Sequence, residues 1–289
     1  MAYSLNKLYQ SIGVSKQAFH QRMDRYLQER SIEEQILMLV YRVREDHPTM
    51  GLRDMYFKIA PIDMGRDRFE ILCKESGLMV ERTHNLRKTT DSSGVIRFDN
   101  LLIGLVINKP NQVWQSDITY FDLNGKFYYI TFIMDAFSRV IVGHAISQRL
   151  KTEQTTLPAL QKAIKSCMDL NICIHALIFH SDGGGQYYDK DFLKLTEKYK
   201  IRNSMCQYPW ENGKAERING IIKNNYLIHR VINSFEQLQI EVDRSVFLYN
   251  TQKPHSKLQR KSPKQFENEY FCMANYTEHV NTDSKESNC

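Results

Sequence analysis

Two strand-like segments joined by Asn124-Gly125 constrain the fold of this 289-residue chain more than any other feature. The segment "QVWQSDITYFDL" before this pair alternates with a period of two, and "KFYYITFIMD" follows it. Asn-Gly is a preferred pair for a tight hairpin turn, because both residues tolerate positive φ angles. A third strand-like segment, "RVIVGHAIS", comes next. The sequence therefore predicts three consecutive antiparallel strands.

Beyond these strands, helical and strand-like segments alternate. A helix from about Glu153 to Leu170 precedes the strand "HALIFHSD", and the helix "KDFLKLTEKYK" precedes the short strand "RNSMC". The loop and helix "CQYPWENGKAERINGIIKNNYL" follow. Three antiparallel strands followed by αβαβα give a mixed sheet with helices on both faces. We expect an α/β domain of the ribonuclease-H-like type over residues 109–270, including C-terminal helices.

The first 85 residues are predicted to be all helical. A short helix ends near Ser11, Gly13-Val14 makes a turn, and Ser15 caps a second helix. The residues expected on the inner face of this second helix are Phe19, Met23 and Leu27. Its outer face is basic and amide-rich, and its candidate DNA contacts are Lys16, Gln17 and Arg22. The pattern is that of a helix-turn-helix, although an ordinary helical hairpin would show it as well.

The rest of this helical region and its flanks are less distinctive. Ser31-Ile32-Glu33-Glu34 resembles a capping box that opens another helix, and "GLRDMYFKI" and "GRDRFEILCKESG" predict two more. Arg66 and Arg68 at the start of the last one suggest a second DNA-reading helix. Residues 86–108 lack periodicity and are expected to form a linker. Residues 271–289 are expected to form an acidic, disordered tail.

Composition narrows the class of protein. The chain is 42% hydrophobic and carries a net charge of +6, so it can form a core and favours polyanionic partners. Residues 211–264 hold ten Lys/Arg and five Asp/Glu, which is 10 − 5 = +5 in one span. None of the six cysteines has zinc-site spacing, and no apolar run approaches membrane length. We expect a soluble, cytoplasmic protein with reduced thiols and no membrane partner.

Three carboxylates stand out. Asp117 lies on a central strand, where an uncompensated charge is costly to bury. Asp182 ends a strand before three glycines, at the edge of the sheet where α/β proteins bind ligands. Glu216 lies on the polar face of the helix that follows residue 212. Each has an ordinary explanation: a strand-end or capping residue, a turn-forming Asp, and a solvated helix face.

Taken together, the three acids point to metal chemistry. Carboxylates without His or Cys partners suit Mg²⁺ or Mn²⁺, which prefer oxygen ligands. Two such ions can activate a water or a 3′-hydroxyl and stabilise the leaving oxygen in phosphodiester transfer. Lys214 and Lys223 on the same helix can hold phosphates.

Five segments resemble insertion-sequence transposases of the retroviral-integrase-like DDE class, the second-reading-frame products of two-frame elements. The segments are "NQVWQSDITYF", "YITFIMDAFSRVIVGHAIS", "HSDGGGQY", "NGKAERINGIIKNNYL" and "YNTQKPHSKLQRKSP", in family order. The resemblance implies that Asp117, Asp182 and Glu216 are the catalytic, metal-binding triad. It also implies that Lys223 holds transposon-end DNA, and the neighbouring Lys214, Arg217 and Asn212 are further candidate DNA contacts.

The resemblance further implies a function and partners. The expected reaction is metal-dependent cleavage at transposon ends, then transfer of the 3′-hydroxyl into double-stranded target DNA. A homo-oligomer on DNA, and fusion to or cooperation with an upstream-frame product, are expected. Two alternatives remain: a ribonuclease-H-like nuclease that only hydrolyses, and a non-catalytic DNA-binding regulator from a decayed element.

The chain departs from the family pattern in one loop. The interval from Asp182 to Glu216 is 216 − 182 = 34 positions, which is slightly shorter than usual. "PWEN" replaces the more frequent composition there, so the role of Trp210 is open between stacking on a DNA base and packing under the loop, and we favour packing.

Overall fold

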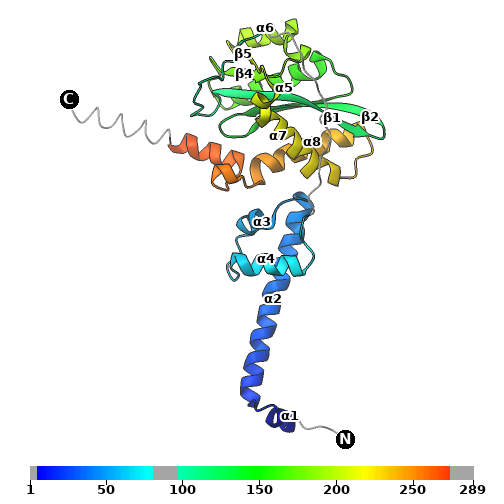
Figure 1. Ribbon diagram of the computed structural model, residues 1–289, viewed down its shortest axis with the longest axis vertical. Coiled ribbons are helices and arrows are strands. Elements are labelled where there is room, and N and C mark those ends of the chain that lie inside the picture. Colours follow the sequence, from blue (N-terminus) through cyan, green and yellow to red (C-terminus); the bar gives the residue numbers. More distant parts are fainter. Residues whose placement is uncertain (1–4, 81–96, 274–289) are drawn as a thin grey trace, which may run out of the picture. The chain divides into compact units, whose positions relative to one another are not determined.

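The computed structural model describes residues 5–80 and 97–273 (Figure 1). The chain divides into two compact units, Met1–Arg82 and Thr83–Cys289. The whole segment "RKTTDSSG" in the expected linker, and all but three residues of the expected tail, lie outside the described residues. Within the described part, no helix is long and apolar enough to cross a membrane.

The described part of the first unit is helical, as predicted. Its helices are α1 (Leu5–Ser11), α2 (Lys16–Asp46), α3 (Leu52–Ile59) and α4 (Arg66–Glu75). The Oγ atom of Ser15 accepts a hydrogen bond from the backbone N–H of Ala18 at 3.1 Å, which confirms Ser15 as the N-cap of α2. Gly77 adopts a positive φ of 70° just after α4, as expected for a helix stop.

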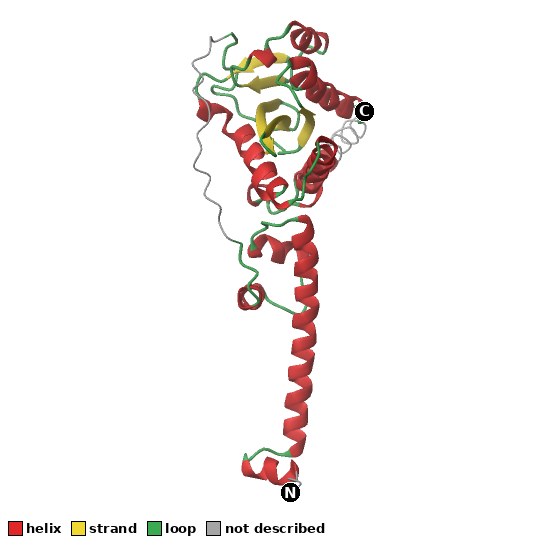
Figure 2. Cartoon of the chain, turned by 90° about the vertical axis from the view of Figure 1, so that its right-hand side faces the viewer, coloured by secondary structure: helices red, strands yellow, loops and turns green. Residues whose placement is uncertain are grey.

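The predicted helix start at Ser31 is wrong, because α2 runs unbroken for 31 residues (Figure 2). A capping box needs a chain that is not yet helical, and no Gly or Pro interrupts the sequence between Ser15 and His47. Glu33 pairs instead with the guanidinium group of Arg68 on α4 at 3.2 Å. Arg68 is therefore engaged with an acid within its own unit.

The inner face predicted for the start of α2 is wrong for two of its three residues, whereas the ring of Phe19 lies 5.2 Å from that of Tyr9 on α1. Met23 and Leu27 are 39% and 57% exposed. The core of this unit lies farther along, where Val40 of α2 packs with Met55 of α3 and Phe69 of α4. The first half of α2 is therefore a helix without a buried face in the described structure.

The second unit contains the predicted mixed sheet. Its strands are β1 (Val113–Leu123), β2 (Lys126–Asp135), β3 (Ile141–Ser147), β4 (Ile178–Ser181) and β5 (Arg202–Met205), in the order β3-β2-β1-β4-β5. β1, β2 and β3 pair antiparallel, whereas β1·β4 and β4·β5 are parallel. Asn124 and Gly125 have φ angles of 54° and 79°, which confirms the predicted hairpin turn.

Helices cover both faces of this sheet. The first of two cores places α5 (Thr156–Asp169) and α6 (Lys190–Lys198) against residues such as Trp114 and Phe179. The second places α7 (Gly213–Asn225) and α8 (Phe235–Gln252) against residues such as Phe132 (Figure 1). Residues 263–273 form a further helix. The predicted α/β class is therefore confirmed.

The described part of the expected linker packs on the second unit. Leu101, Leu102, Leu105 and Ile107 lie against Val113 and its neighbours at the start of the sheet. The backbone N–H of Leu101 also donates to Ser204 Oγ on β5 at 2.9 Å.

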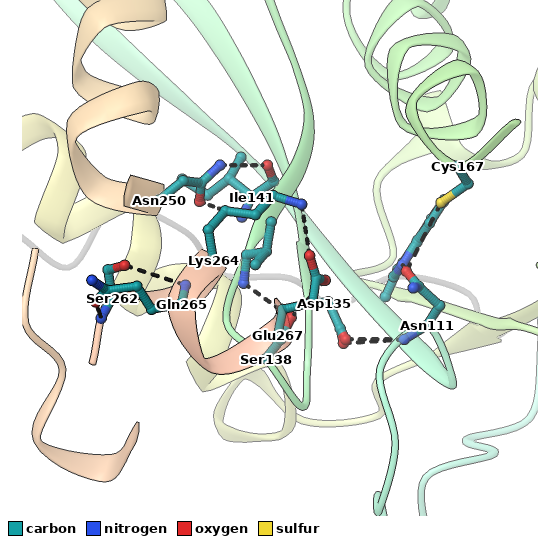
Figure 3. Close-up of polar contacts among 12 residues, drawn as sticks. Asn111, Asp135, Ser138, Ile141, Cys167, Asn250, Ser262, Lys264, Gln265 and Glu267 are labelled. Atoms are coloured by element: carbon teal, nitrogen blue, oxygen red, sulfur yellow. Dashed lines mark hydrogen bonds and ion pairs between the residues drawn. The ribbon is translucent and has the colours of Figure 1, made fainter. Parts of the chain in front are cut away.

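A buried polar network ties the last helix to the turn between β2 and β3 (Figure 3). Asp135 accepts hydrogen bonds from the backbone N–H groups of Asn111 at 3.1 Å and Phe137 at 3.2 Å. Ser138 Oγ donates to Glu267 Oε1 at 3.3 Å, and Lys264 Nζ contacts Glu267 Oε2 at 2.6 Å. Burial raises the pKa of Asp135 to about 7. These contacts make Asp135 a structural residue.

Candidate active site

The register of the sheet places two of the three predicted acids next to each other. Ser116 on β1 pairs with Ser181 on β4 at the last position of the parallel ladder. The next residue is Asp117 in one strand and Asp182 in the other. Hydrogen-bonded neighbouring strands lie about 4.8 Å apart, so the two aspartates emerge side by side at the carboxyl end of β4.

Asp117 faces α7. Its cross-strand partner on β2 is Phe132, whose side chain belongs to the core under α7 and α8. Directly opposed residues in an antiparallel pair point to the same face of the sheet. The amide Nδ2 of Asn219 on α7 donates to Asp117 Oδ2 at 2.8 Å, and the backbone N–H of Ile118 donates to Oδ1 at 2.9 Å.

Two asparagines fasten α7 to β1 on either side of Glu216. Asn212 Nδ2 donates to the backbone oxygen of Ser116 at 2.9 Å, and Asn219 holds Asp117 as described. Both asparagines are buried, at 2% and 7% exposure, whereas Glu216 is exposed. Asn219 lies three residues after Glu216, so both project from neighbouring positions on one helix face. The helix therefore presents Glu216 beside the two aspartates.

The electrostatics of the site reflect this convergence. The pKa of Asp117 is raised to about 7, mainly by burial and then by the charge of Asp182, with a smaller contribution from Glu216. The hydrogen bonds from Ile118 and Asn219 oppose this rise. Burial also raises the pKa of Asp182. Crowded carboxylates of this kind resist ionisation until a cation neutralises them. In the described residues, however, no three Asp, Glu, His or Cys side chains are already placed to hold a metal ion.

The loop after β4 holds Asp182 closely. The backbone N–H of Gly184 donates to Asp182 Oδ1 at 3.2 Å. A Cβ atom at Gly184 would lie 3.1 Å from the same oxygen and 3.2 Å from Gln186 Oε1. The glycine thus lets the backbone approach the carboxylate.

The predicted DNA-contact residues fall into different environments. Lys223 Nζ donates to the backbone oxygen of Tyr120 at 3.1 Å and lies 4.8 Å from the centre of its ring. Lys214 is half-buried with its Nζ 3.5 Å from the backbone oxygen of Ala136, and Arg217 is exposed. Asn212 differs: it was expected to contact DNA, but its side chain is buried against β1.

The remaining predicted DNA contacts lie on the first unit. Lys16, Gln17 and Arg22 are exposed in the first two turns of α2. The structure therefore leaves their side chains open to solvent, as the helix-turn-helix pattern requires.

The loop that departs from the family pattern carries an exposed aromatic stack. The rings of Tyr208 and Trp210 lie 4.5 Å apart at an angle of 4°, and Trp210 is 73% exposed. The favoured expectation that Trp210 packs under the loop is therefore wrong. Glu211 accepts backbone hydrogen bonds from Gln207 at 2.6 Å and Tyr208 at 3.0 Å, which closes the loop and leaves the indole outside.

Sequence reasoning missed the role of Asn219. It lies on the same polar face of the helix as Glu216, and the spacing of three was the available signal. That spacing predicts a shared face, but it does not predict that the amide reaches a carboxylate 102 residues earlier in the chain.

Comparison with known proteins extends these observations. Residues 107–208 and 197–263 match two family models, each described as an integrase core domain. An uncharacterized 31 kDa protein of insertion element IS600 from Shigella sonnei is 30% identical over 277 residues, covering 92% of this chain and 99% of that protein. The transposase for insertion sequence element IS629, also from Shigella sonnei, is 26% identical and covers 78% of this chain and 76% of its own length.

Among solved structures, the catalytic core domain of HTLV-2 integrase in complex with magnesium aligns with a TM-score of 0.44 and 22% identity. The alignment covers 55% of this chain and 97% of that one. The near-complete coverage of the IS600 protein and the two integrase-core matches establish the family of this chain. It belongs to the insertion-sequence transposases with an integrase core domain, within the DDE polynucleotidyl transferases.

Proposed function

We propose that this protein cleaves phosphodiester bonds at the ends of its element and transfers the 3′-hydroxyl into target DNA. Asp117, Asp182 and Glu216 are the proposed catalytic triad. The observation that carries the proposal is the pairing of Ser116 with Ser181, which sets the two aspartates side by side. The hydrogen bond from Asn219 to Asp117 then brings the Glu216 face of α7 to the same place.

The donor set fits Mg²⁺ or Mn²⁺. All three side chains offer carboxylate oxygens, and the charges of Asp182 and Glu216 add to the rise in the pKa of Asp117 that burial causes. Glu216 is exposed, so its side chain has the rotamer freedom to close on an ion that the aspartates already hold. Two bound ions would supply activation of the attacking hydroxyl and stabilisation of the leaving oxygen.

The protein's own residues have binding and orienting roles in this proposal. Asn219 fixes the rotamer of Asp117, and Asn212 fixes the start of α7 on β1. Lys223 holds a DNA phosphate near Glu216, while Lys16, Gln17 and Arg22 on α2 bind the DNA of the element end. Because two ends must be held together, the active form is a homo-oligomer on DNA, alone or with an upstream-frame product.

A strand-transfer assay tests the proposal. Purified protein is incubated with labelled element-end duplexes and a target plasmid, with Mg²⁺ or with EDTA. We expect cleaved ends and joined products that depend on the metal. Asp117→Asn should abolish both while the protein still binds the duplex. Hydrolysis without joined product would instead identify a nuclease, and joining by Asp117→Asn would reject the triad.

A further inference from the structure

Four cationic side chains from three segments gather beside α7, and we call them the cation cluster. They are Arg139 in the turn between β2 and β3, Lys214 and Arg217 on α7, and Lys257 in the short 3₁₀ helix Ser256–Leu258. Lys214 and Arg217 are three residues apart and share a helix face. Arg139 was not among the residues expected to contact DNA.

One contact joins two of these segments, and charge effects connect the third to them. Lys214 Nζ lies 3.5 Å from the backbone oxygen of Ala136, at the start of the turn that carries Arg139. Burial lowers the pKa of Lys214, and the charges of Arg139 and Lys257 lower it further. Burial likewise lowers the pKa of Arg139, with an added contribution from Arg217. Each of the four cations is therefore close enough to another cation of the cluster to feel its charge.

The cluster lacks acidic partners. Among the described residues, none of its four members forms an ion pair, although Arg68, Lys261 and Lys264 of the same chain do. The acid that faces the cluster is Asp135, which is fully buried and accepts backbone hydrogen bonds from Asn111 and Phe137. Like charges held together without a counter-charge mark a site for an external anion.

A second observation at the same place also points to an anion. The hydroxyl of Tyr249 on α8 is buried and has no hydrogen-bond partner, and Arg139 and Arg217 are the charges close enough to act on it. A buried donor without an acceptor is costly, and native proteins seldom retain one without a reason. A phosphate oxygen drawn in by the two guanidinium groups would be the missing acceptor.

We infer that the cation cluster is a binding site for the DNA backbone, in which Arg139, Lys257 and the hydroxyl of Tyr249 are phosphate contacts. The site is adjacent to the triad but made of different residues. The inference rests on the proposed function only in taking DNA as the ligand. The spread of four cations over three segments suits consecutive phosphates of a duplex.

Duplex binding by the full-length protein tests this inference. Fluorescence anisotropy is measured in EDTA, so that no cleavage occurs, with two labelled 30-bp duplexes: one from the element end and one of unrelated sequence. The variants are Arg139→Gln, Arg139→Lys, Lys257→Gln and Tyr249→Phe. Lys165→Gln is the matched control, because it removes one exposed positive charge from α5, on the other face of the sheet.

We expect Arg139→Gln to weaken binding roughly tenfold, and Arg139→Lys to restore much of it. Arg139→Gln and Lys257→Gln should each reduce the slope of log affinity against log salt by about one, whereas Lys165→Gln leaves it unchanged. Tyr249→Phe should weaken binding several-fold without lowering the melting temperature, because it removes an unpaired hydroxyl.

The two duplexes distinguish the source of the DNA. Weakening confined to the element-end duplex assigns the cluster to the transposon end, and equal weakening on both assigns it to DNA of any sequence, such as the target. Affinities and salt slopes equal to those of wild type on both duplexes would overturn the inference, and would point to a protein partner. Because the assay contains no divalent metal, its outcome is independent of whether the triad cuts or joins DNA.

Discussion

Asp117 and Asp135 lie in adjacent strands of one sheet, and the pKa of each is raised to about 7, mainly by burial. Their surroundings differ. Asp135 is fully enclosed and accepts backbone hydrogen bonds from Asn111 and Phe137, next to the paired Glu267 and Lys264. Asp117 opens toward two further acids, Asp182 and Glu216.

The comparison shows that a raised pKa does not by itself identify a functional carboxylate. Burial is also the largest cause at Asp135, where the nearby acid, Glu267, is paired with Lys264 and backbone N–H groups donate to the carboxylate. At Asp117 part of the shift comes from other acids that no cation offsets among the described residues. The like charge contributed by several acids, rather than the size of the shift, supports the proposed metal site.

The largest expected difference between the two aspartates is in activity. Asp117→Asn should reduce strand transfer by a factor on the order of 10³ or more, because it removes a proposed metal ligand. Asp135→Asn should retain activity per folded molecule. The measurement is joined product in the strand-transfer assay, normalised to the folded fraction from circular dichroism. An equal loss of joined product in both variants would contradict the distinction between Asp117 and Asp135.

Stability should respond in the opposite order. Asp135→Ala removes the acceptor for two buried backbone N–H groups, so it should lower the free energy of unfolding by about 3 kcal/mol. Asp117→Ala loses the contacts with Ile118 and Asn219 but relieves repulsion with Asp182, so we expect a change below about 1 kcal/mol. Urea unfolding measures both, and a larger loss at Asp117 would contradict the assignment.

The ionisation of Asp135 should contribute to the pH dependence of the free energy of unfolding. Its pKa is about 7 in the folded protein and about 3.9 in an unfolded chain, so the folded state binds more protons between these values. Its contribution to stability is therefore full below about pH 4 and is lost as the pH rises through about 7. Asp135→Asn should remove up to about 1.4 kcal/mol per pH unit of this slope. If the free energy of unfolding of Asp135→Asn, measured with urea from pH 4 to 8, had the same slope against pH as that of wild type, this contribution of Asp135 would be refuted.

The smallest expected effect is on stability at Glu216. Because its side chain is exposed, Glu216→Gln should change the free energy of unfolding by less than about 0.5 kcal/mol while abolishing strand transfer. Glu197→Gln on α6 is the matched control, since it also neutralises an exposed helical acid and should leave both stability and joining unchanged. Joining by Glu216→Gln at the wild-type rate would remove Glu216 from the triad.

Much of the second unit could be predicted from local pattern. The period-two segments, the Asn124-Gly125 turn and the alternation of helices and strands all appear in the structure. The first unit was harder, because the Ser31 motif has the composition of a helix start inside a longer helix. Whether a capping-box sequence starts a helix depends on whether the preceding residues are already helical. The four residues of the motif alone do not determine this.

The sequence by itself determined the element order of the second unit, the sheet class and the acidic residue types of the candidate site, because periodicity and turn chemistry act over a few neighbouring residues. Only the tertiary structure decided that Asn219 and Asn212 fasten α7 to β1, that Trp210 is exposed, and that Arg139 lies near Arg217. These features depend on side chains far apart in the chain that meet only after the sheet and helices pack, and their partners leave no local pattern.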